Sequence, residues 1–211
     1  MKKFATALTL TLALLPVLAG CGRARFPAYY TLNLPPAPDP AAQESVRASI
    51  AVREFQSPSY LRQGPIVYRP SPEEIGFYEY HRWAADPRAL VTSAVVDHLR
   101  ASGHFSMVSM YTGRPDLDYI FSGKLEKLEE VDYEGGVKVE VAMSAQITSV
   151  ATGATVWSNA ASEVGTVSRR TIPGVVSQMN RTMELAINKL LSTLPSQLSS
   201  SKLTCSPRNS P

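Results

Sequence analysis

The stretch Val137-Lys138-Val139-Glu140-Val141-Ala142-Met143-Ser144-Ala145-Gln146-Ile147-Thr148 has the most regular pattern in the chain. Apolar residues occupy its odd-numbered positions, and mostly polar residues occupy the even-numbered ones. Successive side chains of a β-strand point to opposite faces, so this pattern predicts a strand with one buried face and one wet face. Such alternation is typical of antiparallel sheets.

Strands are also predicted on both sides of this stretch. Glu134-Gly135-Gly136 is a turn signal, and residues 117–131 before it are expected to form a strand. On the other side, Thr152-Gly153 turns the chain into a further strand over residues 155–163. The sequence therefore predicts consecutive strands joined by tight turns.

Two helices have well-marked ends. Asp86 can cap the first, Pro87 suits its first position, and Gly103 suits the residue just past its end. The second follows Pro173 and ends at Pro195. Apolar residues spaced by three and four predict the buried face of this second helix, and they are Val176, Met179, Met183, Ala186, Ile187, Leu190 and Leu194.

Together these elements predict the fold class. Two further strands are expected over residues 46–53 and 105–110, and a hairpin is inserted between the first strand and the first helix. Two helices on one face of a largely antiparallel sheet would bury both apolar stripes, so we expect an α+β domain over residues 45–195. The Ser- and Pro-rich residues 196–211 are expected to form a disordered tail.

The N-terminus has the parts of a secretory signal. Lys2 and Lys3 precede an apolar run over residues 5–18 that is short for a membrane span. Leu18-Ala19-Gly20-Cys21 then resembles the lipobox of bacterial lipoproteins. The resemblance implies that residues 1–20 are removed as a signal peptide and that Cys21 carries the lipid. The alternative is an ordinary signal peptide with a cysteine nearby by chance.

The residues after the lipobox bear on which membrane would hold the mature chain and on how it would be attached. By resemblance to Gram-negative lipoproteins, Gly22 in place of aspartate implies sorting to the outer membrane, facing the periplasm, rather than retention at the inner membrane. The proline-rich residues 21–44 are expected to form a tether. Within it, Tyr29 to Leu32 have strong β propensity and could add an edge strand.

Charge and cysteine content exclude several classes of protein. The formal net charge of +3 falls to +1 when the signal removes Lys2 and Lys3, so no nucleic-acid partner is expected. Of the two cysteines, Cys21 is taken by the lipid, which leaves Cys205 without an intrachain partner. The three histidines do not form a metal pattern, and no nucleotide-binding or hydrolase motif is present, so we expect neither a cofactor nor enzymatic activity.

The insertion over residues 56–83 is dense in aromatic residues and arginine, which are enriched at protein interfaces. Two interpretations stay open: the hairpin packs these side chains on its own domain, or it presents them to a partner. A second charged group, between Lys124 and Glu134, is expected to be a solvated hairpin tip. The candidate partner contacts are Tyr68, Arg69, Phe77, Tyr78, Tyr80, His81, Arg82 and Trp83.

The same insertion carries a family resemblance. Tyr29 to Leu32, Pro58 to Arg69 and Glu79 to Ala84, together with the lipobox, resemble the ABC-type transport auxiliary lipoproteins, the PqiC-like family. The resemblance implies a membrane-anchored accessory protein with an MCE-domain protein and its ABC transporter as partners, in a system that moves lipids or other hydrophobic molecules. Self-association is left open. The alternatives are a structural or assembly-factor envelope lipoprotein and a periplasmic lipid-binding protein.

Replacing the lipidated cysteine should release the protein. We expect Cys21→Ala to leave the outer-membrane fraction or to stay unprocessed, because acyl chains at roughly 0.8 kcal/mol per buried CH₂ hold the chain on the membrane. Fractionation and immunoblotting would measure both effects. Cys205→Ala is the matched control and should fractionate as wild type. Unchanged cleavage and membrane association of Cys21→Ala would contradict the prediction.

Overall fold

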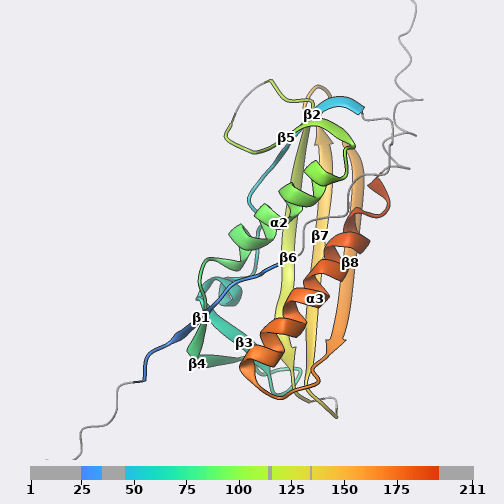
Figure 1. Ribbon diagram of the computed structural model, residues 1–211. Helices are drawn as coiled ribbons and strands as arrows, with labels where there is room; N and C mark the ends of the chain where they lie inside the picture. Colours follow the sequence, from blue (N-terminus) through green and yellow to red (C-terminus); the bar gives the residue numbers. More distant parts are fainter. Residues whose placement is uncertain (1–24, 35–45, 114–115, 134, 195–211) are drawn as a thin grey trace, which may run out of the picture.

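The computed structural model describes residues 25–34, 46–113, 116–133 and 135–194 (Figure 1). The lipobox with Cys21, part of the expected tether, Cys205 and the expected tail lie outside these residues. The described chain forms an eight-stranded sheet, two α-helices and a short 3-10 helix. In order they are β1 (Ala28–Tyr30), β2 (Val46–Val52), η2 (Ser59–Arg62), β3 (Pro65–Arg69), β4 (Gly76–Trp83), α2 (Pro87–Ala101), β5 (Phe105–Met110), β6 (Tyr119–Val131), β7 (Lys138–Ser149), β8 (Thr155–Thr166) and α3 (Ile172–Leu191).

Strand β6 is the longest strand of the sheet and is paired along both edges. One edge is antiparallel to β7, which is in turn antiparallel to β8. The other edge is shared, because β2 pairs with the first residues of β6 and β3 with its last residues, both in parallel. A bridge between Gln56 and Lys124 lies between these two pairings. Strand β5 then adds to β2, β4 adds to β3, and β1 adds to β4.

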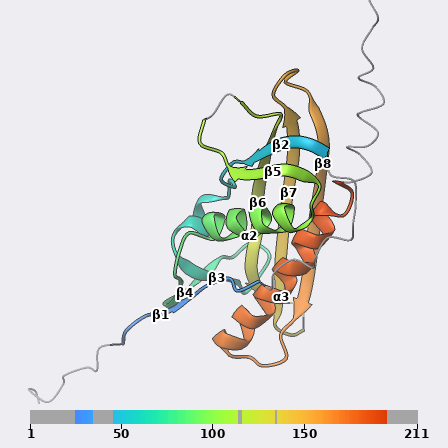
Figure 2. The same ribbon diagram turned by 45° about the horizontal axis from the view of Figure 1, so that its top comes forward.

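The predicted α+β class, with a largely antiparallel sheet and two helices on one face, is confirmed (Figures 1 and 2). The predicted strands are present and differ from the observed ones by a few residues at their ends. The parallel pairings of β1, β2, β3 and β5 were not predicted. Alternation shows which residues of a strand are buried, but it does not show which strand is its neighbour.

Helix α2 begins where the sequence predicts, and α3 begins at Ile172, just before the predicted start after Pro173. The side chain of Asp86 accepts a hydrogen bond from the backbone N–H of Arg88 at 2.9 Å, and Pro87 follows the cap. After the helix, Gly103 has a φ of 65°, a left-handed conformation that favours glycine. In α3 the hydroxyl of Thr171 accepts from the backbone N–H of Gly174 at 3.3 Å.

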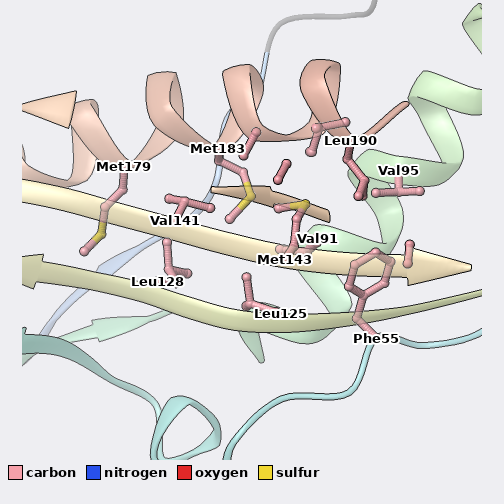
Figure 3. Packing of buried hydrophobic residues seen from close by; sticks show 14 of the residues in the cluster. Phe55, Val91, Val95, Leu125, Leu128, Val141, Met143, Met179, Met183 and Leu190 are labelled. Carbon is pink, nitrogen blue, oxygen red and sulfur yellow. The ribbon is translucent and has the colours of Figure 1, made fainter. Parts of the chain in front are cut away.

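The core lies between the two helices and the sheet. Every residue of the predicted apolar face of α3 is buried. Figure 3 shows side chains of α3 pointing toward side chains of β6 and β7, with residues of α2 beside them. The labelled residues of this group are Val91, Val95, Leu125, Leu128, Val141, Met143, Met179, Met183 and Leu190.

The ring of Phe55 packs in the core directly against the backbone of β6, at a position where that strand has a glycine, Gly123. The Phe55 ring lies 6.1 Å from the ring of Phe121, which lies 5.8 Å from that of Trp157. A Cβ at Gly123 would come within 2.3 Å of the Phe55 ring. Gly123 is therefore required by a close approach and not by an unusual backbone conformation.

A methyl group at position 123 should push Phe55 out of its place. We expect Gly123→Ala to lower the free energy of unfolding by roughly 1–3 kcal/mol, as overpacked cores do. Denaturant unfolding would measure the loss. Gly136→Ala is the matched control, because a Cβ there meets nothing within 4 Å, and it should change stability by less than about 1 kcal/mol. Equal stability of the two variants would mean that Phe55 can move at no cost.

Candidate functional site: the β3–β4 hairpin

The insertion between residues 56 and 83 forms a hairpin of β3 and β4 that lies inside the sheet. The two strands are antiparallel, with a register shift between Pro65 and Val67. The second edge of β3 pairs with β6, and the second edge of β4 pairs with β1. Neighbouring strands therefore hold the hairpin from both sides.

An ion pair fixes β3 to β6. The Nε of Arg69 donates to Oε1 of Glu129 at 2.7 Å, and Glu129 is fully buried. The bond to Glu129 raises the pKa of Arg69. Arg69 Nη1 also donates to the carbonyl of Pro72 at 2.9 Å, which closes the hairpin turn. Arg69 is therefore occupied within the domain.

A hydrogen bond also fixes β4 to β6, through Glu130, which follows Glu129 on that strand. The hydroxyl of Tyr78 donates to Oε2 of Glu130 at 2.8 Å. Burial, and then this bond, raise the pKa of Tyr78. Burial also raises the pKa of Glu130, while the bond from Tyr78 opposes part of that rise. Because adjacent strand residues point to opposite faces, the hairpin is fixed to β6 from both faces of the sheet.

The expectation that the charges between Lys124 and Glu134 form a solvated hairpin tip is wrong for two of them. Glu129 is 0% exposed and Glu130 is 3% exposed. Sequence reasoning missed them because carboxylates are almost never fully buried unless they are paired. Their partners, Arg69 and Tyr78, lie more than fifty residues earlier in the chain.

Two of the candidate aromatic residues also pack within the domain. Trp83 is 4% exposed and belongs to the core. The Tyr68 ring lies 4.8 Å from that of Tyr78 and covers Gly76, where a Cβ would come within 2.2 Å of it. These positions agree with the interpretation in which the hairpin packs on its own domain.

His81 and Arg82 link the hairpin to its neighbours. The hydroxyl of Tyr30 on β1 and Nδ1 of His81 lie 3.0 Å apart in a hydrogen bond. Arg82 Nη2 donates to the carbonyl of Gln63, just after η2, at 3.0 Å. Both side chains are half-buried.

The last two aromatic candidates on the hairpin are Phe77 and Tyr80. Phe77 is exposed, and neither it nor Tyr80 belongs to the core cluster. The Tyr80 ring is half-buried, and the guanidinium of Arg25 lies 6.0 Å from its centre. Phe77 and Tyr80 therefore lie on the hairpin outside the core of the domain.

Three further properties of the described residues bear on metal binding, membrane crossing and ligand binding. No group of three or more His, Cys, Asp or Glu side chains among them could hold a metal ion. In this part of the chain, neither helix combines the length and the apolar content that crossing a membrane requires. An open groove crosses β6, β7 and β8, and its lining includes Arg53, Lys124, Gln146 and Ser158.

Burial of Glu130 should make the stability of the domain depend on pH. Its pKa is raised in the folded state, so the folded protein binds this proton more tightly than the unfolded chain does. The resulting stabilisation is fully present below the ordinary carboxyl pKa and is lost as pH rises through the raised pKa. We therefore expect Glu130→Gln to become more stable relative to wild type as pH rises through this interval.

Urea unfolding at pH values from about 4 to 8 would measure this difference. Glu73→Gln, an exposed carboxylate in the turn of the same hairpin, is the control for the loss of one negative charge. A difference between Glu130→Gln and wild type that stays constant across this pH range would contradict the prediction.

Comparison with solved structures shows that the fold is shared. A crystal structure of a Xanthomonas campestris protein of the DUF330 family has a TM-score of 0.74 at 16% identity, over 83% of this chain and 99% of that one. A crystal structure of an uncharacterized protein has a TM-score of 0.63 at 13% identity, over 80% of this chain and 99% of that one. No curated protein matches the chain significantly.

A family model identifies the chain more specifically. The model of the ABC-type transport auxiliary lipoprotein component matches residues 30–190. The match begins in β1, contains the whole β3–β4 hairpin and ends in the last turn of α3. It confirms the resemblance found in the sequence, and the chain belongs to the ABC-type transport auxiliary lipoprotein family.

Proposed function

We propose that the chain is an outer-membrane lipoprotein that serves as the docking subunit of an ABC transporter and its MCE-domain protein. Such a system moves lipids or other hydrophobic molecules across the periplasm. The observation that carries the proposal is the family match over residues 30–190, since the family consists of auxiliary lipoproteins of ABC-type transport. Gly22, next to the proposed lipid site Cys21, favours the outer membrane over the inner one.

The geometry of the hairpin supports docking rather than catalysis. Three of its polar side chains hold the fold: Arg69 and Tyr78 bind β6, and His81 binds β1. The aromatic side chains of Phe77 and Tyr80 lie outside the core and leave surface for a partner. Aromatic side chains bury a large area at low entropy cost, so they are suited to contact another protein.

Truncating an outward aromatic residue should weaken partner binding without unfolding the domain. We expect Tyr80→Ala to cost about 2 kcal/mol of binding free energy, roughly thirtyfold in affinity, with little change in melting temperature. Affinity purification of the lipidated protein from membranes, with quantification of the MCE-domain protein by mass spectrometry, would measure retention of the partner.

Two further variants make the comparison decisive. Tyr133→Ala removes an aromatic ring that is 37% exposed beside the β6–β7 turn, and it should retain the partner. Trp83→Ala should lower the free energy of unfolding by about 3–5 kcal/mol, because Trp83 lies in the core. If Tyr80→Ala lowers the melting temperature but keeps the partner, the hairpin is structural and docking occurs elsewhere.

A further inference from the structure

We propose that one edge of the domain rests directly on the phospholipid leaflet that holds the acyl chains, so that the domain has a fixed orientation on the membrane. The inference rests on the proposed lipid attachment at Cys21 and adds a second, non-covalent contact to it. We call this surface the membrane edge, and it consists of Arg25, Phe26, Tyr29 and Arg82.

The length of chain before the described residues limits how far this edge can be from the leaflet. Cys21 lies four residues before Arg25, and four residues span at most about 14 Å even when fully extended. The sequence alone favours a longer tether, but Ala28 to Tyr30 are paired with β4 and belong to the sheet. A lipid on Cys21 would therefore hold the β1 edge close to the headgroups.

The segment that follows the anchor is attached firmly to the domain. The carbonyl of Tyr30 accepts from the backbone N–H of Ala84 at 2.7 Å, and the N–H of Asn33 donates to Oδ1 of Asn180 on α3 at 2.9 Å. Leu32 between them packs against the core. These contacts join the anchored segment to both the sheet and α3, so the orientation of β1 is the orientation of the whole domain.

The side chains of the membrane edge have the chemistry of a membrane interface. Among the described residues, Phe26 and Tyr29 are the most exposed large apolar side chains, at 86% and 63%. Aromatic rings accompanied by arginine are enriched at the level of lipid headgroups, where the rings meet the apolar boundary and the cations meet phosphates. Tyr29 is the register partner of Arg82, so both side chains lie on one face of the sheet.

The charge of this edge favours an anionic leaflet. Arg25 and Arg82 contribute two positive charges, and Glu79 beside Tyr80 contributes one negative charge. Each basic residue near an anionic surface adds a favourable electrostatic term that falls off within a Debye length. Exposed aromatic residues, excess positive charge and a short lipid linker therefore coincide at one edge of the domain.

The test compares the distance of two sites from the bilayer in the full-length lipidated protein. Cys205→Ser removes the native free thiol, and the same environment-sensitive dye is attached at Gln63→Cys, beside Arg82, or at Val164→Cys on β8. Strand β8 lies at the opposite edge of the sheet from β1 (Figure 1). In vesicles of phosphatidylethanolamine and phosphatidylglycerol that contain a brominated phospholipid, we expect quenching at position 63 to be severalfold stronger than at position 164.

Charge substitutions then test the membrane edge itself. Phe26→Asp combined with Tyr29→Asp should lower quenching at position 63 toward the value at position 164. Met107→Asp combined with Leu185→Asp is the matched control, since these apolar residues are 51% and 57% exposed elsewhere on the domain, and it should leave the quenching unchanged. Melting temperatures would show that every variant is folded.

The possible failures are distinguishable. Equal quenching at positions 63 and 164 in protein that floats with the vesicles would overturn the membrane edge and leave the lipid anchor intact. Unchanged quenching after the substitutions at Phe26 and Tyr29 would also overturn it. Protein that does not float with the vesicles would overturn lipid attachment at Cys21, and the inference with it.

Discussion

The backbone of β6 must be hydrogen-bonded along both edges, because an unpaired N–H or C=O group in the core costs as much as a lost hydrogen bond. Neither β2 nor β3 is long enough to pair with its thirteen residues. The chain between them fills the gap: the backbone N–H of Gln56 donates to Gly123, and its carbonyl accepts from Leu125. The hairpin follows Gln56 along the chain, and its first strand, β3, pairs with the last residues of β6.

Buried carboxylates then restrict the register of this pairing. Taking a carboxylate out of water is costly unless a positive or hydrogen-bonding partner replaces the water. Arg69 and Tyr78 are such partners for Glu129 and Glu130, on opposite faces of β6. A slip of β3 by one residue would move Arg69 to the wrong face and leave Glu129 buried without its cation. The two interactions thus favour a single register of the hairpin against β6.

Local features of the fold could be predicted from the sequence, whereas contacts between distant residues could not. The alternation over residues 137–148 and the caps at Asp86 and Pro87 are local signals, and each produced the expected element. The partners of Glu129 and Glu130, and the parallel pairing of β1 with β4, depend on residues about fifty positions away. A single sequence contains no local trace of such pairings.

The same limit applied to the candidate site. Composition identified the aromatic and arginine residues of the hairpin, but only the pairing of strands separates buried Trp83 from exposed Phe77. Phe26 lies in a segment whose composition predicts a tether, so the sequence alone gives it no role. Its exposure becomes informative because β1, two residues later, pairs with β4 and so places this segment beside the hairpin. The informative feature is therefore the combination of a local motif with a distant contact.

Placing the proposed lipid anchor and the proposed docking surface on one edge would have a physical consequence for transport. The guanidinium of Arg25 lies 6.0 Å from the Tyr80 ring, so the anchored segment adjoins the proposed docking surface. Each CH₂ group that a hydrophobic molecule exposes to water costs about 0.8 kcal/mol, so even a short aqueous gap would oppose its transfer. A partner docked at Phe77 and Tyr80 would end beside the leaflet, whereas a partner docked on β8 would end at the far edge of the domain. The proposed arrangement therefore assigns the lipoprotein the task of holding the end of the transporter against the membrane.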